Sequence, residues 1–170
     1  MVAGLNEMVV ESVRVHMLSS QHVVILRDTL RERYLPIWIG PWEANAIATR
    51  LQGVTPERPM THDLFSQTLE ELGVVVKQII VSDLADDTFR ARLLLELDGR
   101  SVDVDARPSD AIALAVRTGV PIFATDAVLD RAGVVPESDE DEKLSVFREF
   151  VNSLNIDLPG EDPEERRRLD

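Results

Sequence analysis

Apolar and polar residues in the N-terminal third of the chain fall into short runs rich in Val and Ile, a pattern typical of β-strands. Residues 8–15 and 22–28 are two such runs, and the Ser-Ser-Gln turn between them predicts a hairpin. Residues 34–39 predict a third strand. Pro36 within it indicates an edge position or a bulge, because proline cannot donate to the hydrogen-bond ladder.

The spacing then changes to the three- and four-residue period of helices. Gly40-Pro41 precedes a first predicted helix, whose apolar stripe is Ala44, Ile47, Ala48 and Leu51. After a loop over residues 53–59, Thr61 is the expected N-cap of a second helix that ends at Gly73. Its predicted inner face is Leu64, Phe65, Thr68, Leu69 and Leu72.

The second half of the chain repeats both patterns. Runs over 74–81, 88–97 and 100–106 predict strands, and Asp98-Gly99 between the last two is a strong hairpin signal. Residues 107–110 open a third helix that is apolar on every side and therefore deeply buried. A short strand over 121–124 and a short helix over 126–132 follow. The fold class is therefore α+β, with a mixed, largely antiparallel sheet packed with three main helices and a C-terminal helix.

Composition and charge limit where this fold can act. The chain has 170 residues and a formal net charge of −13, and it contains no cysteine, which excludes disulfides and thiolate chemistry. Residues 137–170 hold 12 acidic and 5 basic residues, so they form an acidic C-terminal helix and tail beyond a domain over 7–135. We expect a cytoplasmic protein, because neither a secretory leader nor a membrane span is visible. Such a charge repels nucleic-acid phosphates at long range.

The Asp98-Gly99 hairpin fixes a register that can be used to find chemistry. It places Arg92 opposite Asp105 and Arg90 opposite Arg107, and it puts all four with Asp103 on one face of the sheet. Three arginines can hold a phosphate, and two carboxylates on one strand face can share a divalent ion. A solvated ladder of salt bridges explains the same residues, apart from the two arginines that face each other.

Two predicted helix starts carry further candidates. His62 can act as a general base or a metal ligand, with Asp63 orienting it, although an acid there also serves the helix dipole. Ser109 and Asp110 can form an anion or metal site beside Arg107, or can cap the helix. Trp38 and Trp42 can stack on bases, but the low aromatic content favours a packing role.

Several blocks in a fixed order resemble the bifunctional nuclease family. They are LPIWIG at 35–40, EA at 43–44, AIA at 46–48, RPMTHDL at 58–64, DARPSDAIALA at 105–115 and PI at 121–122. The resemblance covers about residues 7–135. It implies a small α+β domain that self-associates, with a dimer favoured, and that acts on both DNA and RNA.

The sequence leads to two functional hypotheses. In the first, the protein is a metal-assisted phosphodiesterase with little sequence specificity. Asp105, Asp110, Asp63 and Glu43 would hold Mg²⁺ or Mn²⁺, His62 would act as base or ligand, and Arg90, Arg107 and Ser109 would bind phosphate. In the second, it is a non-enzymatic oligomeric module that binds a small anion or a protein partner. The first requires these residues to meet in one pocket.

Overall fold

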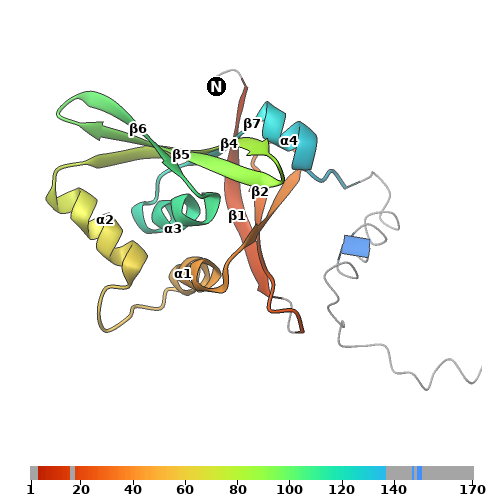
Figure 1. Cartoon of the computed structure of the whole chain (residues 1–170), viewed down its shortest axis with the longest axis horizontal. Helices are drawn as coiled ribbons and strands as arrows, with labels where there is room; N and C mark the ends of the chain where they lie inside the picture. The colour runs from red at the N-terminus through yellow and green to blue at the C-terminus, as the bar shows by residue number, and fades with distance from the viewer. Residues whose placement is uncertain (1–3, 16–17, 137–146, 148, 151–170) are drawn as a thin grey trace, which may run out of the picture.

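The computed structural model describes residues 4–15, 18–136, 147, 149 and 150, and it confirms the α+β class (Figure 1). The elements in chain order are β1 (Leu5–Val15), β2 (His22–Asp28), β3 (Tyr34–Ile39), α1 (Pro41–Leu51), α2 (Thr61–Glu71), β4 (Val75–Ala85), β5 (Thr88–Leu97), β6 (Arg100–Ala106), α3 (Pro108–Thr118), β7 (Ile122–Thr125) and α4 (Asp126–Ala132).

The described strands form one seven-stranded sheet in the order β3-β2-β1-β7-β4-β5-β6. Two antiparallel meanders, β1–β3 and β4–β6, are joined by β7, which pairs antiparallel with β1 and parallel with β4. The sheet is therefore mixed and largely antiparallel, as predicted. β3 lies at an edge of the sheet, a position where proline is tolerated.

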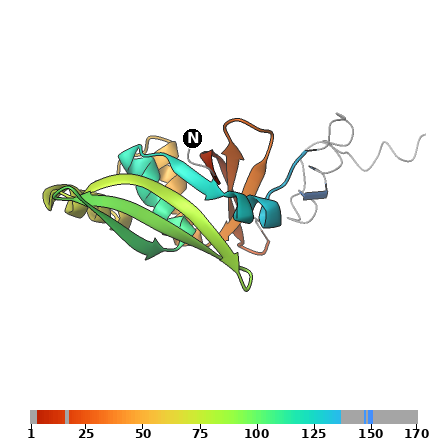
Figure 2. The ribbon, with the colours of Figure 1, turned by 90° about the horizontal axis from the view of Figure 1, so that it is seen from above.

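Helix α3 lies at the centre of the helical layer. Every residue from Ala111 to Ala115 is buried, because the helix contacts β4 and β5 on one side while α1 and α2 pack against its other sides. Gly119 ends it in the left-handed conformation, which glycine adopts without strain. Seen from above, strands β4–β6 lie in front of the three helices (Figure 2).

Helix α2 departs from its predicted packing. Its N-cap is Met60, one residue before the expected Thr61. Leu64 and Leu72, which the pattern placed on the inner face, are exposed, and no residue of the helix is buried. The reason is that α2 packs beside α3 at the periphery rather than against the sheet, so little apolar surface faces it.

The β5–β6 hairpin has the predicted register. Leu97 pairs with Arg100, and Arg92 pairs with Asp105. Asp98 and Gly99 both have positive φ, as the tight turn requires. Val102 and Val104, however, are exposed, since β6 is the edge strand and the helical layer does not cover it fully.

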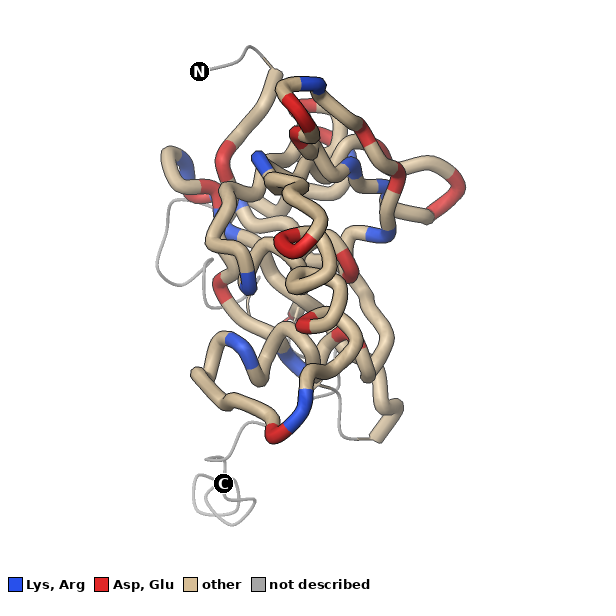
Figure 3. The backbone as a smooth tube through the Cα atoms, turned by 90° about the vertical axis from the view of Figure 1, so that its left-hand side faces the viewer, with Lys and Arg blue, Asp and Glu red and all other residues tan. Residues whose placement is uncertain are grey.

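The predicted C-terminal helix, with its stripe Leu144, Phe147, Val151 and Leu154, falls mostly outside the described residues, as does the tail. Phe150 and Tyr34 both pack against the pair formed by Val23 and Ile25 on β2. In the described part of the chain, basic and acidic positions are interspersed (Figure 3). None of the helices described there has the length and apolar character to span a membrane.

Candidate active site

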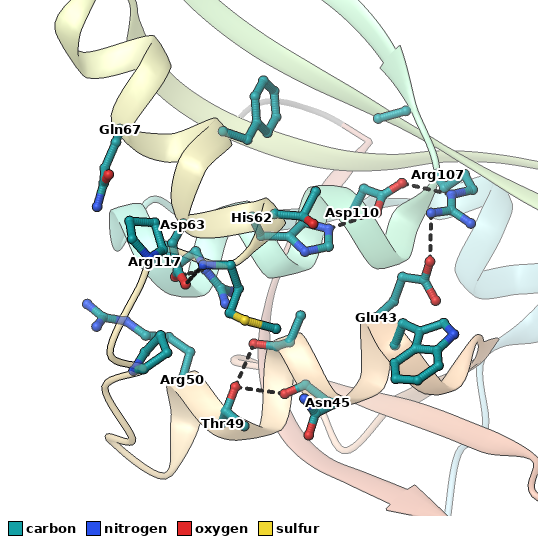
Figure 4. Close-up of a pocket in the computed structure, with 18 of the residues that line it drawn as sticks. Glu43, Asn45, Thr49, Arg50, His62, Asp63, Gln67, Arg107, Asp110 and Arg117 are labelled. Carbon is teal, nitrogen blue, oxygen red and sulfur yellow. Dashed lines mark hydrogen bonds and ion pairs between the residues drawn. The ribbon is translucent and has the colours of Figure 1, made fainter.

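A pocket of about 1200 Å³ lies between the helices and the β5–β6 hairpin. Its walls come from α1, the loop before α2, α2 itself, strands β5 and β6, and the start and end of α3 (Figure 4). It brings together predicted site residues that are far apart in the sequence. Those that line it are Glu43, His62, Asp63, Asp105, Arg107 and Asp110.

His62 and Asp110 form the central contact of the pocket. His62 stands in the first turn of α2, and its Nε2 lies 2.8 Å from Oδ1 of Asp110 in the first turn of α3. Burial raises the pKa of Asp110, but hydrogen bonds from Arg107 and His62 outweigh burial and hold that pKa below its ordinary value. The ionised carboxylate can only accept, so Nε2 carries the hydrogen, and the neutral form of the ring then has its lone pair on Nδ1.

Arg107 extends this contact into a chain of four side chains. It is the N-cap residue of α3, where its Nε donates to Asp110 Oδ2 at 2.7 Å and its Nη2 donates to Glu43 Oε1 at 2.8 Å. Both hydrogen bonds raise the pKa of Arg107. Its side chain is nevertheless 65% exposed, whereas His62 is 14% exposed. The guanidinium is thus held from two sides and still faces solvent (Figure 4).

Gly40 gives Glu43 the room to reach Arg107. Gly40 is the N-cap of α1, and a Cβ built there would overlap Oε2 of Glu43. With no side chain at this position, the Glu43 carboxylate folds back over the start of α1 and points toward Arg107. The Gly-Pro start of the helix therefore contributes to the site.

Asp63 lines the same pocket but ties two helices together. Its Oδ1 accepts from Arg117 Nε at 2.7 Å, and its Oδ2 accepts from the backbone N–H of Met60 at 2.9 Å. Burial raises its pKa, but these two donors outweigh burial and lower it. Asp110, rather than Asp63, therefore orients His62.

Arg117 is a pocket residue that the sequence analysis missed. It is almost completely buried, and it joins α3 to Asp63 on α2. Its sequence signal was a single arginine in the last turn of a helix predicted to be buried on every side, where a charge needs a partner.

The structure separates the arginines and aspartates that were predicted to share one face of β5 and β6. Pairing of the two strands ends at Ala91 and Ala106, so Arg107 leaves the sheet and turns toward the helices. The prediction that it shares a face with Arg90 and Arg92 is therefore wrong. Arg92 donates from Nε to Asp103 Oδ1 at 2.7 Å, and Asp103 lies two residues along β6 from the expected partner, Asp105.

Three further candidates lie away from the centre of the pocket. Asp105 borders it, but its strand position shares a face with Arg92, whose pKa its charge raises. Arg90 stands opposite Asp83 on β4, and Ser109 is buried beneath the start of α3. Among the residues described, the pocket lining includes neither Arg90 nor Ser109.

The pocket does not form a ready-made cage for a divalent ion. Within residues 4–15, 18–136, 147, 149 and 150, no three His, Asp or Glu side chains are arranged to hold a metal. The oxygens of Glu43, Asp63 and Asp110 face arginines instead. An ion coordinated by Asp110 would have to displace Arg107 or His62, so these residues do not fit a metal in the arrangement described.

Comparison with known proteins places this fold and pocket in a family. The model of the Bifunctional nuclease domain matches residues 24–137, which contain all six pocket candidates. An uncharacterized protein of Mycobacterium tuberculosis is 43% identical over 162 residues, covering 90% of this chain and 97% of its own length. The chain belongs to the bifunctional nuclease family.

Plant relatives carry the family name. Bifunctional nuclease 2 of Oryza sativa subsp. japonica is 29% identical over 150 residues, and Bifunctional nuclease 1 of the same subspecies is 22% identical over 146 residues. Each match covers 84% of this chain but less than half of the plant protein, 46% and 44% respectively. The remaining parts of the plant proteins lie outside these alignments.

Proposed function

We propose that this chain hydrolyses phosphodiester bonds in DNA and RNA at the pocket between α1, α2 and α3. The observation that carries the proposal is the chain of hydrogen bonds from Glu43 through Arg107 and Asp110 to His62, built from three distant parts of the sequence around one open pocket. Family membership supports the same activity.

His62 acts as the general base. Asp110 fixes the ring through Nε2, which leaves Nδ1 to take a proton from an attacking water. The water oxygen forms a bond to phosphorus while the bond to the leaving oxygen breaks, and that oxygen takes a proton from solvent. Asp110 stays ionised throughout and stabilises the charged imidazolium that forms.

Arg107 binds the phosphate. Its guanidinium is already fixed by Asp110 and Glu43, so little conformational entropy is lost when a phosphate oxygen meets the exposed N–H groups. The positive charge is then in place before negative charge builds up on the phosphoryl oxygens, which is the condition for electrostatic stabilisation of a transition state.

The predicted requirement for Mg²⁺ or Mn²⁺ stays a prediction. The carboxylates of the pocket are engaged by arginines, so assistance by a metal requires a rearrangement of Arg107 when the substrate arrives. Cleavage that survives EDTA would show that the side chains suffice, and cleavage restored by added Mg²⁺ or Mn²⁺ would show that a divalent ion takes part.

The decisive experiment passes the purified full chain over a size-exclusion column. Each fraction is then assayed for cleavage of end-labelled DNA and RNA 20-mers. We expect activity that follows the protein peak and is lost in His62→Ala, whose melting temperature should stay close to that of the original chain. Activity that elutes apart from the protein, or that is unchanged in His62→Ala, would contradict the proposal.

The non-enzymatic alternative is supported by a different observation. Leu64 and Leu72 on α2 leave apolar surface exposed, which a protein partner or a second copy of the chain would cover. We propose a homo-oligomer on this ground, as the family resemblance implies. An inactive protein that elutes as an oligomer would favour the binding module over the nuclease.

A further inference from the structure

Trp42 is exposed at the rim of the proposed active-site pocket. Trp42 stands in the first turn of α1, where it lines the pocket and is 82% exposed. An indole ring left in water forgoes the free energy that its burial would supply. Packing within the described chain therefore does not explain this residue.

Trp42 is placed beside the phosphate-binding arginine. Its neighbour in the chain, Glu43, holds Arg107 through Nη2 at 2.8 Å. Trp42 and Arg107 line the same pocket, and Glu43, which holds the guanidinium, directly follows Trp42 in α1. A strand whose phosphate meets Arg107 would therefore pass the part of the pocket wall to which Trp42 belongs.

The rest of α1 continues this surface along the pocket. Trp42, Asn45, Thr49 and Arg50 all line it and recur at helical spacing, so they form one strip. Figure 4 labels Asn45, Thr49 and Arg50 on α1. Trp42 and Arg50 are separated by a rise of roughly 12 Å, at about 1.5 Å per residue. This is the length of about three stacked nucleotides of one strand, at about 3.4 Å each.

Charge favours a substrate held by stacking over one held by many phosphates. The chain carries a net charge of −13, and in the pocket the acids Glu43, Asp63 and Asp110 are matched by arginines. Duplex binding depends on neutralising many phosphates, whereas stacking of an unpaired base supplies affinity that needs little charge. In a duplex the base faces are already stacked on one another.

We infer that the pocket selects single-stranded nucleic acid, with an unpaired base stacked on Trp42, one phosphate at Arg107 and the strand continuing toward Arg50. This inference rests on the proposed function and adds the class of substrate. Trp42 is a specificity-determining residue here, and it takes no part in the proton transfer assigned to His62.

The test measures the fluorescence of Trp42. The chain has two tryptophans, so Trp38→Phe leaves Trp42 as the sole indole, and His62→Ala in the same protein keeps the strand intact. We expect an unlabelled single-stranded dodecamer to quench the Trp42 fluorescence to saturation, and the blunt duplex of the same sequence to quench it little. Salt titration of both probes separates stacking from charge.

Substitution supplies the controls. Trp42→Ala should weaken single-strand binding roughly 5- to 150-fold, the range measured when a stacking aromatic is removed, and Trp42→Phe should restore most of it. Trp38→Ala is the matched control, because Trp38 is 51% exposed but lies on β3, outside the described lining of the pocket. Its affinity should not change.

The outcomes separate this inference from the proposed function. Equal binding of single strand and duplex, no binding of either, or no effect of Trp42→Ala would overturn the inference, even if the protein cleaves both substrates. If Trp42→Ala alters the oligomeric state and leaves strand affinity unchanged, the ring belongs to a protein interface and the inference is also overturned. Strand binding with Trp42 quenching, but without cleavage by the chain that retains His62, would instead contradict the proposed function.

Discussion

Two networks of aspartate and arginine in this protein use the same contacts but differ in access to solvent. Asp28 accepts two hydrogen bonds from the Arg33 guanidinium and two from backbone N–H groups, and its side chain is 2% exposed. Asp110 accepts from Arg107 and His62, but Arg107 is 65% exposed at the rim of a large pocket. In both cases burial raises the aspartate pKa and the donors lower it further than burial raises it.

The difference shows what marks a functional site in this fold. A lowered aspartate pKa and a short ion pair occur in both networks, so neither property identifies the active site. The Asp28 network connects structural elements to one another. Arg33 also donates a hydrogen bond to Asn6 on β1, and Asn6 in turn donates to Asp126 on α4. The Asp110 network ends at a histidine and an exposed guanidinium, both of which can meet a substrate.

The largest expected effect comes from disrupting the buried network of Asp28 and Arg33. Asp28→Asn leaves the mostly buried Arg33 without its anion, which should cost about 3 kcal/mol of unfolding free energy. The melting temperature should fall by roughly 6–12 °C, while nuclease activity per folded molecule stays the same. Calorimetry and a cleavage assay below the transition check both statements. A loss of activity without a loss of stability would remove the distinction between the networks.

Disrupting the solvent-exposed network of Asp110 and Arg107 should have the opposite effect, a loss of activity with little loss of stability. Arg107→Lys keeps a positive charge but cannot bind Asp110 and Glu43 in the same forked geometry. We expect kcat/KM to fall by about 10²-fold, comparable to the loss of one preorganised donor, with a small change in melting temperature because the side chain is exposed. Steady-state kinetics and a thermal scan of one preparation measure both. A destabilised but fully active variant would contradict the assignment.

A smaller effect should follow from Gly40→Ala. The φ of −72° at this position suits alanine, but the added Cβ would push the Glu43 carboxylate away from Arg107. Losing one of two anchors should lower kcat/KM by roughly fivefold, equivalent to about 1 kcal/mol. Gly99→Ala is no control, since its positive φ strains the backbone, whereas Ala48→Ser changes the same helix at a residue outside the described lining of the pocket. Kinetics of the two variants side by side test the role of Gly40.

The smallest effect concerns pH. Asp28, Asp63 and Asp110 have folded-state pKa values below their ordinary value of 3.8, so in acid the unfolded chain binds more protons than the folded one. Their contribution to stability is complete above that value and is lost as the pH falls through the lower folded-state values. The melting temperature should therefore drop steeply below about pH 4, and less steeply in Asp28→Asn. Equal slopes would contradict the assignment of Asp28.

The sequence predicted the strands and α3 well because each of these elements carries its own periodic pattern. The register of β5 and β6 followed from Asp98-Gly99 alone. The exposure of Leu64 on α2 could not be predicted, because an amphipathic stripe does not tell how much surface its partner offers. His62, Asp110, Glu43 and Arg107 were named as candidates, but their contacts depend on how three helices pack.

Other features of the site had no local signal. That Arg107 leaves the sheet depends on where strand pairing stops, and the pairing of Arg117 with Asp63 depends on the crossing of α2 and α3. The metal was expected from the position of acidic residues on one strand face and at helix starts, and only the packed structure turns the carboxylates of Glu43, Asp63 and Asp110 toward arginines.

The central claim is that His62 and Asp110 work as one unit in phosphodiester hydrolysis, and a double-mutant cycle tests it most directly. The measurement is kcat/KM of His62→Ala, Asp110→Asn and the double variant on one labelled RNA strand. Residues that act as a unit give losses that do not multiply, so the double variant should be no slower than His62→Ala alone, about 10²- to 10⁴-fold below the original chain. Losses that multiply, or full activity in either single variant, would contradict the account.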